Sequence, residues 1–346
     1  MVLQSEAFRF YGSDEPKKRF PRAKPDSAIR CISLSEDCLL MATISKFHLA
    51  VWSVSDPKQP MIKWELKQPM SSFDLVFACQ NSRLFLGEKK GIYIFEINNA
   101  IDASRPNPAE FLRKSSEVLS LSVSKAQLCV CGLFNGVIEI FNENEPSVVL
   151  QTITVSPVCN VYISRNGKLF LSCSVENYFR VWKINNNGRE PCEMLEYQAI
   201  HSEWVWGSFV SEDLSTAISL EGEYSAKVLV WNLLSEETER KPMHTLSNHA
   251  ISVADVSEDF STCFLANDGE LTTWDIRGNK LRKIANFQVS ITDISVSLSQ
   301  CACACADGSV WLIDLAFEDR MRLLAIVKGS FFPIDIYKKI KKALYT

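Results

Sequence analysis

The residues best suited to chemistry in this chain are cysteines that alternate with other residues, Cys301, Cys303 and Cys305 in one run and Cys129 and Cys131 in another. Thiolates are zinc ligands, so these runs raise the question of a metal site. Along a β-strand, however, residues two apart share one face and lie about 7 Å from each other. Tetrahedral zinc needs ligands that converge within about 2.3 Å of one point. We therefore interpret these cysteines as small buried side chains of strands and predict no metal site.

The sequence motifs of common enzyme classes are missing from the chain. It contains no Gly-x-x-x-x-Gly-Lys phosphate loop, no His-Glu-x-x-His zinc motif and no Gly-x-Ser-x-Gly nucleophile elbow. Its four histidines do not pair at the spacing of metal ligands. We therefore predict a protein that is not an enzyme and that uses no cofactor.

Composition limits the partners and the location of the protein. Hydrophobic residues make up 47% of the chain and charged residues 23%, and the net charge is −4, too small for the whole surface to attract nucleic acid or membrane. No apolar stretch is long enough to predict a membrane span, and the N-terminal sequence lacks the apolar core of a secretory signal. The 12 cysteines fall in strand-like runs and not in a disulfide framework. We expect a cytoplasmic or nuclear protein.

One repeated pattern predicts the elements that must position any functional group. A short hydrophobic strand that ends in Trp, or in a substitute for Trp, occurs seven times at intervals of 39 to 49 residues. The seven anchor residues are Trp52, Phe95, Phe141, Trp182, Trp231, Trp274 and Ile313. A period near this length is typical of four-stranded units that stack radially into a ring. The sequence therefore predicts an all-β fold, a seven-bladed β-propeller with four-stranded antiparallel blades.

Turn signals separate the strands within each unit. In the first unit, the expected strands are 28–34, 39–45, 48–54 and 61–67. The turn before the anchor strand carries an Asn-Gly or Asp-Gly pair in three units, at positions 135–136, 268–269 and 307–308, which favours a two-residue hairpin. The turn before the second strand repeats as Ser-Glu-Asp at 35–37, 211–213 and 257–259. Both signals agree with antiparallel neighbours.

On these anchors, the chain resembles the WD-repeat propeller family over residues 28–327. The full Trp-Asp pair occurs at Trp274-Asp275, and two units begin with a His near the family's Gly-His position, His201 and His249. The other copies are degenerate, since Phe or Ile replaces Trp in three of them. We therefore expect fewer of the buried polar networks that the family carries.

Two segments lie outside the repeats. We interpret residues 1–27 as an N-terminal arm whose basic run, 17–24, is solvated; the alternative is a nuclear-targeting or phosphate-contacting patch. Residues 328–346 predict a basic amphipathic helix, which has isoleucine or leucine every four residues. The outermost strand of the last blade comes either from 321–327, which we favour, or from 6–12, which would join the two chain ends.

The resemblance implies that partners bind on the top rim, which carries the turns that enter each first strand and those that precede each anchor strand. Trp204 and Trp206 are the strongest candidates there, because Trp is enriched at interface hot spots; the alternative is that both pack between blades. The other candidate partner-binding residues are Arg30, Lys46, Asp74, Lys89, Tyr178 and Tyr224. An aromatic cluster opposite the lysines would suit a peptide with an acidic or aromatic anchor.

These observations favour a non-catalytic protein-interaction scaffold or adaptor subunit of a multiprotein complex. One alternative is an accessory subunit of an RNA- or DNA-associated complex, which requires a contiguous basic stripe; the two termini are its only candidates. A second alternative rests on Trp274-Asp275-Ile276-Arg277, which is similar to the sequence carried by WD-repeat substrate receptors of cullin-RING ubiquitin ligases. In those receptors the Arg contacts the adaptor protein, so the resemblance implies that role for Arg277.

Overall fold

The structure of the chain is a computed structural model. The structure describes residues 17–20, 28–55, 60–66, 74–78, 81–97, 110–125, 127–142, 148–151, 156–176, 178–185, 190–213, 215–222, 227–234, 241–246, 251–297 and 300–315. The segments proposed from sequence for the C-terminal helix, 328–346, and for the closing strand, 6–12 or 321–327, lie outside these ranges.

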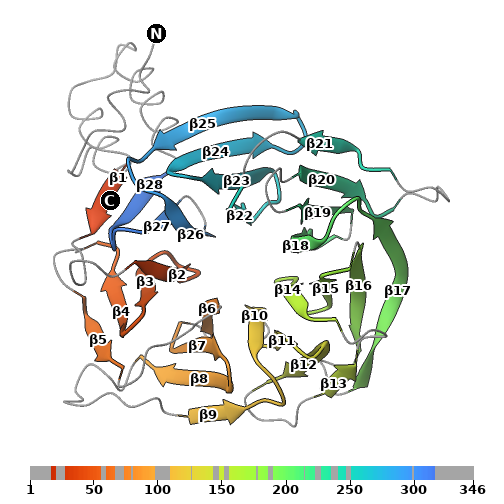
Figure 1. Cartoon of the computed structure of the whole chain (residues 1–346), viewed down its shortest axis with the longest axis horizontal. Helices are drawn as coiled ribbons and strands as arrows, with labels where there is room; N and C mark the ends of the chain where they lie inside the picture. Colours follow the sequence, from red (N-terminus) through yellow and green to blue (C-terminus); the bar gives the residue numbers. More distant parts are fainter. Residues whose placement is uncertain are drawn as a thin grey trace, which may run out of the picture.

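Seven antiparallel four-stranded sheets surround one central axis, as Figure 1 shows. The predicted fold class, a seven-bladed β-propeller, is therefore confirmed. In blades 1 to 6, the first strand of each unit is innermost and the fourth is outermost. Because neighbouring strands are antiparallel, the turns between second and third strands and the connections into each first strand form one rim, called the top rim here. The turns between first and second strands, and between third and fourth, form the bottom rim.

The strands of the first four blades follow the chain in order. Blade 1 contains β2 (Ile29–Leu34), β3 (Leu40–Ser45), β4 (His48–Ser53) and β5 (Ile62–Glu65). Blade 2 contains β6 (Asp74–Ala78), β7 (Arg83–Glu88), β8 (Gly91–Glu96) and β9 (Glu110–Arg113). Blade 3 contains β10 (Val118–Val123), β11 (Cys129–Leu133), β12 (Val137–Phe141) and β13 (Val148–Gln151). Blade 4 contains β14 (Val158–Ile163), β15 (Leu169–Ser174), β16 (Tyr178–Asn185) and β17 (Glu190–Ile200).

The remaining blades complete the ring. Blade 5 contains β18 (Val205–Val210), β19 (Thr216–Glu221), β20 (Lys227–Asn232) and β21 (His244–Leu246). Blade 6 contains β22 (Val253–Val256), β23 (Thr262–Asn267), β24 (Glu270–Asp275) and β25 (Lys280–Asn286). Blade 7 contains β26 (Ile291–Ser297), β27 (Gln300–Cys305) and β28 (Val310–Asp314), with β1 (Lys17–Phe20) as its outermost strand.

The last blade is closed by the N-terminal part of the chain. β1 pairs with β28 in antiparallel register from Lys17 opposite Ile313 to Phe20 opposite Val310. This position was expected for 321–327 or for 6–12; Lys17–Phe20 occupies it instead, so the N-terminal part of the chain closes the ring, but through a different segment from the one expected. The outer edge of β28 presents backbone groups that need partners, and a short strand of any side-chain type can supply them.

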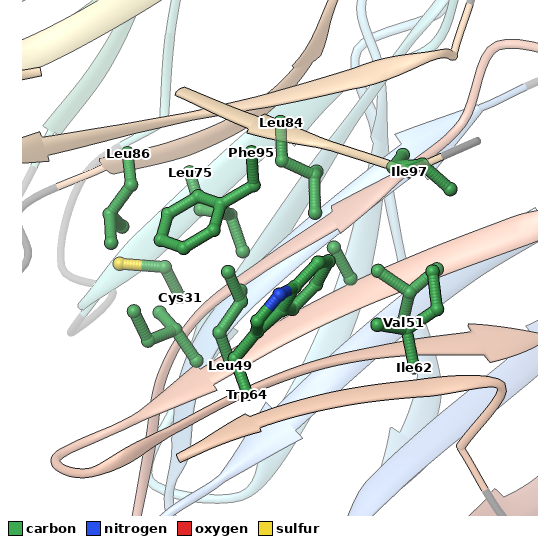
Figure 2. Packing of buried hydrophobic residues seen from close by; sticks show 12 residues of the cluster. Cys31, Leu49, Val51, Ile62, Trp64, Leu75, Leu84, Leu86, Phe95 and Ile97 are labelled. Carbon is green, nitrogen blue, oxygen red and sulfur yellow. The ribbon is translucent and has the colours of Figure 1, made fainter. Parts of the chain in front are cut away.

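The anchor residues explain why the blades stack. All seven are buried, and each lies on the third strand of its blade. Between blades 1 and 2, Trp64 packs against Phe95 with ring centroids 5.3 Å apart (Figure 2). Leu75 and Leu84 of blade 2 lie in the same cluster as Leu49 of blade 1. Because each such cluster takes residues from adjacent blades, a truncation of one anchor loosens two blades at once, at a cost of about 3–5 kcal/mol for an aromatic ring.

The Ser-Glu-Asp turns on the bottom rim share one hydrogen-bond pattern. In blade 5, Ser211 Oγ donates to Asp213 Oδ1 at 2.7 Å and accepts the Thr216 N–H at 3.0 Å. Equivalent serine-to-carboxylate bonds occur in the turns of blades 1 and 6. Side chains of this kind replace missing backbone partners in tight turns, so the sequence signal for the turn is confirmed.

The hairpin turns on the top rim use left-handed backbone conformations. Asp268 and Gly269 have φ values of 42° and 85°, so this Asp-Gly pair has the positive φ at both central positions that a type I′ turn requires. A Cβ atom at Gly269 would lie 2.4 Å from the carbonyl oxygen of Phe287. The neighbouring connection therefore packs directly against the turn, which leaves room only for glycine.

Polar side chains on the innermost strands join neighbouring blades. Each accepts a backbone N–H from the innermost strand of the next blade. These bonds join Asp74 to Leu121 at 2.8 Å, Asn160 to Ser208 at 3.0 Å, Asp255 to Val296 at 2.7 Å and Asp293 to Ile32 at 2.8 Å. Around the axis, they act as links between sheets that share no strand.

Three of these links, Asp74, Asp255 and Asp293, are carboxyl groups whose pKa values are raised above the ordinary value for Asp. Burial raises the pKa of Asp74 to about 6 and the pKa of Asp255 to about 7. Burial also raises the pKa of Asp293 well above its ordinary value, and the negative charges of the other two carboxylates add to that effect. The backbone N–H donors oppose the increase in each case but do not overcome it.

The cysteine runs lie on second strands. Cys301, Cys303 and Cys305 are fully buried, and the Sγ atoms of Cys301 and Cys303 are 4.0 Å apart. Cys129 and Cys131 are also buried. The prediction that these residues pack as small apolar side chains is confirmed. In the ranges that the structure describes, no three His, Cys, Asp or Glu side chains are grouped so that they could hold a metal ion.

Several tryptophan anchors keep a polar contact inside the blade. Trp231 Nε1–H donates to Ser219 Oγ at 2.8 Å, and the same hydroxyl lies 2.7 Å from Nε2 of buried His201. Trp52 and Trp182 also donate to a buried hydroxyl on the second strand of their own blade. The anchors of blades 2, 3 and 7 are Phe or Ile, so these anchor side chains have no indole N–H to donate. The replacement of Trp by Phe or Ile therefore removes the anchor-to-hydroxyl hydrogen bond that Trp52, Trp182 and Trp231 make.

Candidate interaction surface

The two tryptophans favoured from sequence lie where the chain enters blade 5 on the top rim. Both Trp204 and Trp206 are half-buried. Trp206 packs against the hydrophobic cluster between blades 5 and 6. The carbonyl of Trp204 accepts the Gly222 N–H at 3.1 Å, which ties this residue to the adjacent hairpin turn. Both residues are therefore partly accessible to a partner; Trp206 is held by its packing against this cluster, and Trp204 by its backbone bond.

The connection that precedes Trp204 is braced by one buried carboxylate. Glu221 accepts hydrogen bonds from the Ser202 N–H at 3.0 Å, from Ser202 Oγ at 2.7 Å and from Lys227 Nζ at 2.8 Å. Burial alone would raise the pKa of Glu221, but the bonds from Lys227 and Ser202 lower it below its ordinary value. The carboxylate is therefore ionised at neutral pH and holds the loop against the second strand.

The other predicted rim residues have different environments. Arg30, Lys46 and Lys89 are exposed at the top ends of blades 1 and 2. Asp74 lies at the start of β6, but both of its oxygens accept N–H groups, from Leu75 and from the next blade. Its role is thus to join blades. The side chain of Tyr178 and all of Tyr224 lie outside the part of the chain that the structure describes.

Sequence reasoning missed two exposed aromatic residues on the same rim. Phe47 and Phe134 occupy hairpin turns of blades 1 and 3, with 40% and 53% of their surfaces exposed. Lys46 Nζ lies 5.4 Å from the centre of the Phe47 ring, within the range of a cation–π contact. The sequence signal that could have identified them is their position. Each Phe lies between the second and third strands of its blade, where the hairpin pattern predicts a turn on the top rim.

The bottom rim is crossed by charged side chains. Arg165 of blade 4 forms an ion pair with Glu258 of blade 6 at 2.5 Å, and Lys125 of blade 3 forms one with Glu36 of blade 1. The Lys125 N–H donates to the Arg165 carbonyl at 2.9 Å. Turns of four blades are thus connected across the axis, and each ion pair passes over a blade that does not contribute to it.

Arg277 lies on this bottom rim, just after β24. Its side chain is exposed, and its N–H donates to Asp275 Oδ1 at 3.1 Å. It lines a pocket of about 470 Å³ between blades 5 and 6, together with Met243, Glu212 and Asp259. Trp274 and Ile276 are buried, whereas Asp275 and Arg277 of this four-residue sequence are exposed and could contact another molecule.

Comparison with known proteins identifies no relative of this chain among family models or curated proteins. The seven-bladed architecture is consistent with the WD-repeat resemblance. Across the described ranges, no helix is long and apolar enough to span a membrane. The function of the protein is therefore inferred from its fold and from the residues on its two rims.

Proposed function

We propose that this protein is a non-catalytic scaffold or adaptor subunit that binds other proteins on the top rim of its propeller. The observation that carries the proposal is the half-buried pair Trp204 and Trp206, displayed on a loop braced by Glu221. A rigid, partly exposed indole loses little conformational entropy when a partner covers it, which is why Trp is common at interface hot spots. Propellers commonly serve as interaction platforms of this kind.

The two rims differ in a way that supports the choice of the top rim. Ion pairs between turns of distant blades cross the bottom end of the axis. The top end instead carries exposed or half-exposed side chains on several innermost strands, including Arg30, Thr292 and Trp206. Within the described residues, a partner that approaches the top rim would meet these side chains without first separating an ion pair that spans the axis.

Affinity capture from nuclease-treated cell extract, followed by mass spectrometry, tests the proposal. Wild type is compared with the double variant Trp204→Ala/Trp206→Ala and with a matched control, Leu39→Ala/Leu234→Ala, which removes two exposed apolar side chains from the bottom rim. Circular dichroism and thermal melting verify that both variants fold. We expect a set of captured proteins that the tryptophan variant loses and the control keeps.

Other outcomes would contradict the proposal. If the folded tryptophan variant captures every wild-type partner, the pair does not form the binding surface. If the wild-type set disappears on nuclease treatment, the protein is an accessory subunit of an RNA- or DNA-associated complex instead.

A second candidate function follows from the exposure of Arg277 beside the pocket between blades 5 and 6. In this reading, the protein is a substrate receptor of a cullin-RING ubiquitin ligase, and Arg277 contacts the adaptor. The variant Arg277→Ala would then lose a cullin adaptor from the captured set while keeping the top-rim partners. If no cullin component is captured by wild type, this reading is wrong.

A further inference from the structure

The top ends of blades 1 and 2 carry a group of exposed cations. We call this group the basic arc; it consists of Arg30, Lys46, Lys89, Lys90 and Arg113. In the described part of the same two blade ends, Glu65 is the exposed carboxylate, while Glu88 is buried and Asp74 is engaged between blades. The arc therefore has an excess of positive charge although the whole chain is negative.

The backbone holds the centre of this arc in place. Lys89 and Lys90 form the hairpin turn of blade 2, and the Lys90 carbonyl accepts the Lys114 N–H at 3.2 Å. Gly91 follows with a φ of 152°, and a Cβ atom there would lie 2.1 Å from the Leu112 carbonyl oxygen. The outermost strand thus packs directly against the turn. Arg113, paired with Gly91 in the sheet register, stands beside the two lysines.

A buried ion pair supports the neighbouring connection from blade 2 to blade 3. Lys114 Nζ lies 2.7 Å from Glu139 Oε2 and 4.2 Å from the centre of the Phe141 ring, and both charged side chains are buried. This lysine is neutralised by its carboxylate and does not belong to the arc. Its burial anchors the chain directly after Arg113, so the base of the arc is fixed.

Exposed aromatic rings lie on both sides of the arc. Phe47 is in the hairpin turn of blade 1, and Phe134 is in that of blade 3, while the two lysines of blade 2 lie between them around the ring (Figure 1). The Phe134 N–H donates to the Glu117 carbonyl at 2.9 Å, which fixes this turn to the connection into β10. Blade 1 therefore carries Phe47 beside two cations of the arc, blade 2 carries the other cations, and blade 3 carries Phe134.

We propose that the basic arc, with Phe47 and Phe134, binds an acidic peptide segment of a partner protein, in which carboxylates are flanked by aromatic or aliphatic side chains. Carboxylates of such a segment would face Lys46, Lys89 and Lys90, and its apolar residues would cover the two phenylalanines. The inference rests on the proposed function, because it names the class of partner that the top rim receives. It concerns a part of the rim distinct from the tryptophan pair on blade 5.

The limited extent of the arc favours a peptide over nucleic acid. Phosphate backbones need several cations in a continuous stripe. Within the described part of the top rim, the turns and strand entries with exposed cations belong to blades 1 and 2, whereas Glu203 of blade 5 and Asp268 of blade 6 are exposed on the same rim. A short acidic segment would contact only the cations of these two blades, and a longer polyanion would meet these carboxylates.

Fluorescence anisotropy with a synthetic peptide tests the inference. The probe is a fluorescein-labelled peptide of sequence Asp-Glu-Phe-Asp-Glu-Leu, and its neutral counterpart has Asn and Gln in place of the acids. We expect the full chain to bind the acidic probe, with an affinity that falls as salt increases, and not the neutral one. Lys46→Glu/Lys89→Glu/Lys90→Glu should weaken binding about tenfold or more, since three exposed charge contacts are lost and reversed.

Two matched variants make the result specific. Lys63→Glu/Lys168→Glu/Lys241→Glu changes the net charge equally at exposed lysines outside the arc and should bind the probe like wild type. Phe47→Ala/Phe134→Ala should weaken binding while leaving its salt dependence unchanged. Far-ultraviolet circular dichroism and melting curves confirm that each variant is folded before titration.

Several outcomes would overturn the inference. These are equal binding of the acidic and neutral probes, equal weakening by both lysine variants, and tighter binding of a single-stranded RNA of the same charge. If the acidic probe fails but tryptophan-dependent partners are still captured, the proposed function stands and only the inference about the arc fails. If the probe binds while capture does not depend on the tryptophans, the scaffold binds through the arc alone.

Discussion

The three carboxylates that join blades around the axis predict an unusual pH dependence of stability. In the unfolded chain, Asp has a pKa near 3.9, whereas burial raises the pKa of Asp74 to about 6 and that of Asp255 to about 7 in the propeller. Between these values, the folded state binds more protons than the unfolded state. The free energy of unfolding should therefore increase as the pH falls from 8 to 5, the opposite of ordinary salt-bridged carboxylates.

The size of the effect follows from the same shifts. One pKa unit corresponds to about 1.4 kcal/mol, so from pH 8 to pH 5 Asp255 and Asp74 together give an upper bound of about 4 kcal/mol. Both side chains are half-buried, and solvent along the axis screens their charge, so we expect about 2 kcal/mol. Carboxylates with lowered pKa values, such as Glu221 and Asp213, lose their contribution only below this window.

Urea unfolding at pH 5, 6, 7 and 8, followed by tryptophan fluorescence, measures the change. The comparison is Asp74→Asn/Asp255→Asn, in which an amide oxygen can still accept the N–H of the next blade, as Asn160 does. Both proteins carry the same four histidines, so the difference between the two pH profiles reports the aspartates. If wild type and variant gain the same free energy from pH 8 to pH 5, these carboxylates are ionised in the folded state and the reasoning is refuted.

Three further predictions concern the closing strand and two buried polar contacts. Deleting residues 1–20 should lower stability by about 2 kcal/mol or more relative to a chain that lacks only residues 1–16, because the outer edge of the last blade loses a paired strand; equal melting temperatures of these two variants would contradict the role of the closing strand. Lys114→Met should cost about 3–5 kcal/mol in urea unfolding because it leaves Glu139 buried without its cation, and adding Glu139→Leu should recover most of that loss; an additive double variant would show that the two side chains are not coupled. Trp231→Phe should cost at least about 0.5–1.5 kcal/mol, because the buried Ser219 hydroxyl loses its indole donor while it keeps its contact with His201, and an unchanged midpoint would argue against that bond.

The fold could be predicted from sequence because its strongest signals are local. An anchor such as Trp231 must be buried, and its third-strand position follows from the turns on either side. Asp268-Gly269 needs left-handed backbone that few other pairs adopt, so it marks a hairpin wherever it occurs. Seven copies of the same local signals then define the ring. Burial of the cysteines followed from the same reasoning, since alternate positions of a strand share one face.

The remaining features depend on contacts between distant parts of the chain. Lys17–Phe20 closes the ring through backbone hydrogen bonds, and these leave no trace in side-chain type, so a short basic segment gave no strand signal. Asp74 looked like a rim residue because its neighbour in blade 3 cannot be read from spacing. The partial burial of Trp206 likewise depends on how blade 6 packs against blade 5. Phe47 and Phe134 escaped notice because single apolar residues in turns are common in soluble proteins.

The closing strand also sets an order of events during synthesis. Its partner, β28, is the last strand of the described chain, so Lys17–Phe20 leaves the ribosome before every residue with which it will pair. At roughly 5–20 residues per second, this segment waits on the order of tens of seconds. Until it docks, the outer edge of the newest blade can accept the same segment from another nascent copy, which would exchange strands between two molecules. For correct closure, β28 must therefore pair with residues 17–20 of its own chain before it pairs with the same residues of another chain that is being synthesised on the same messenger RNA.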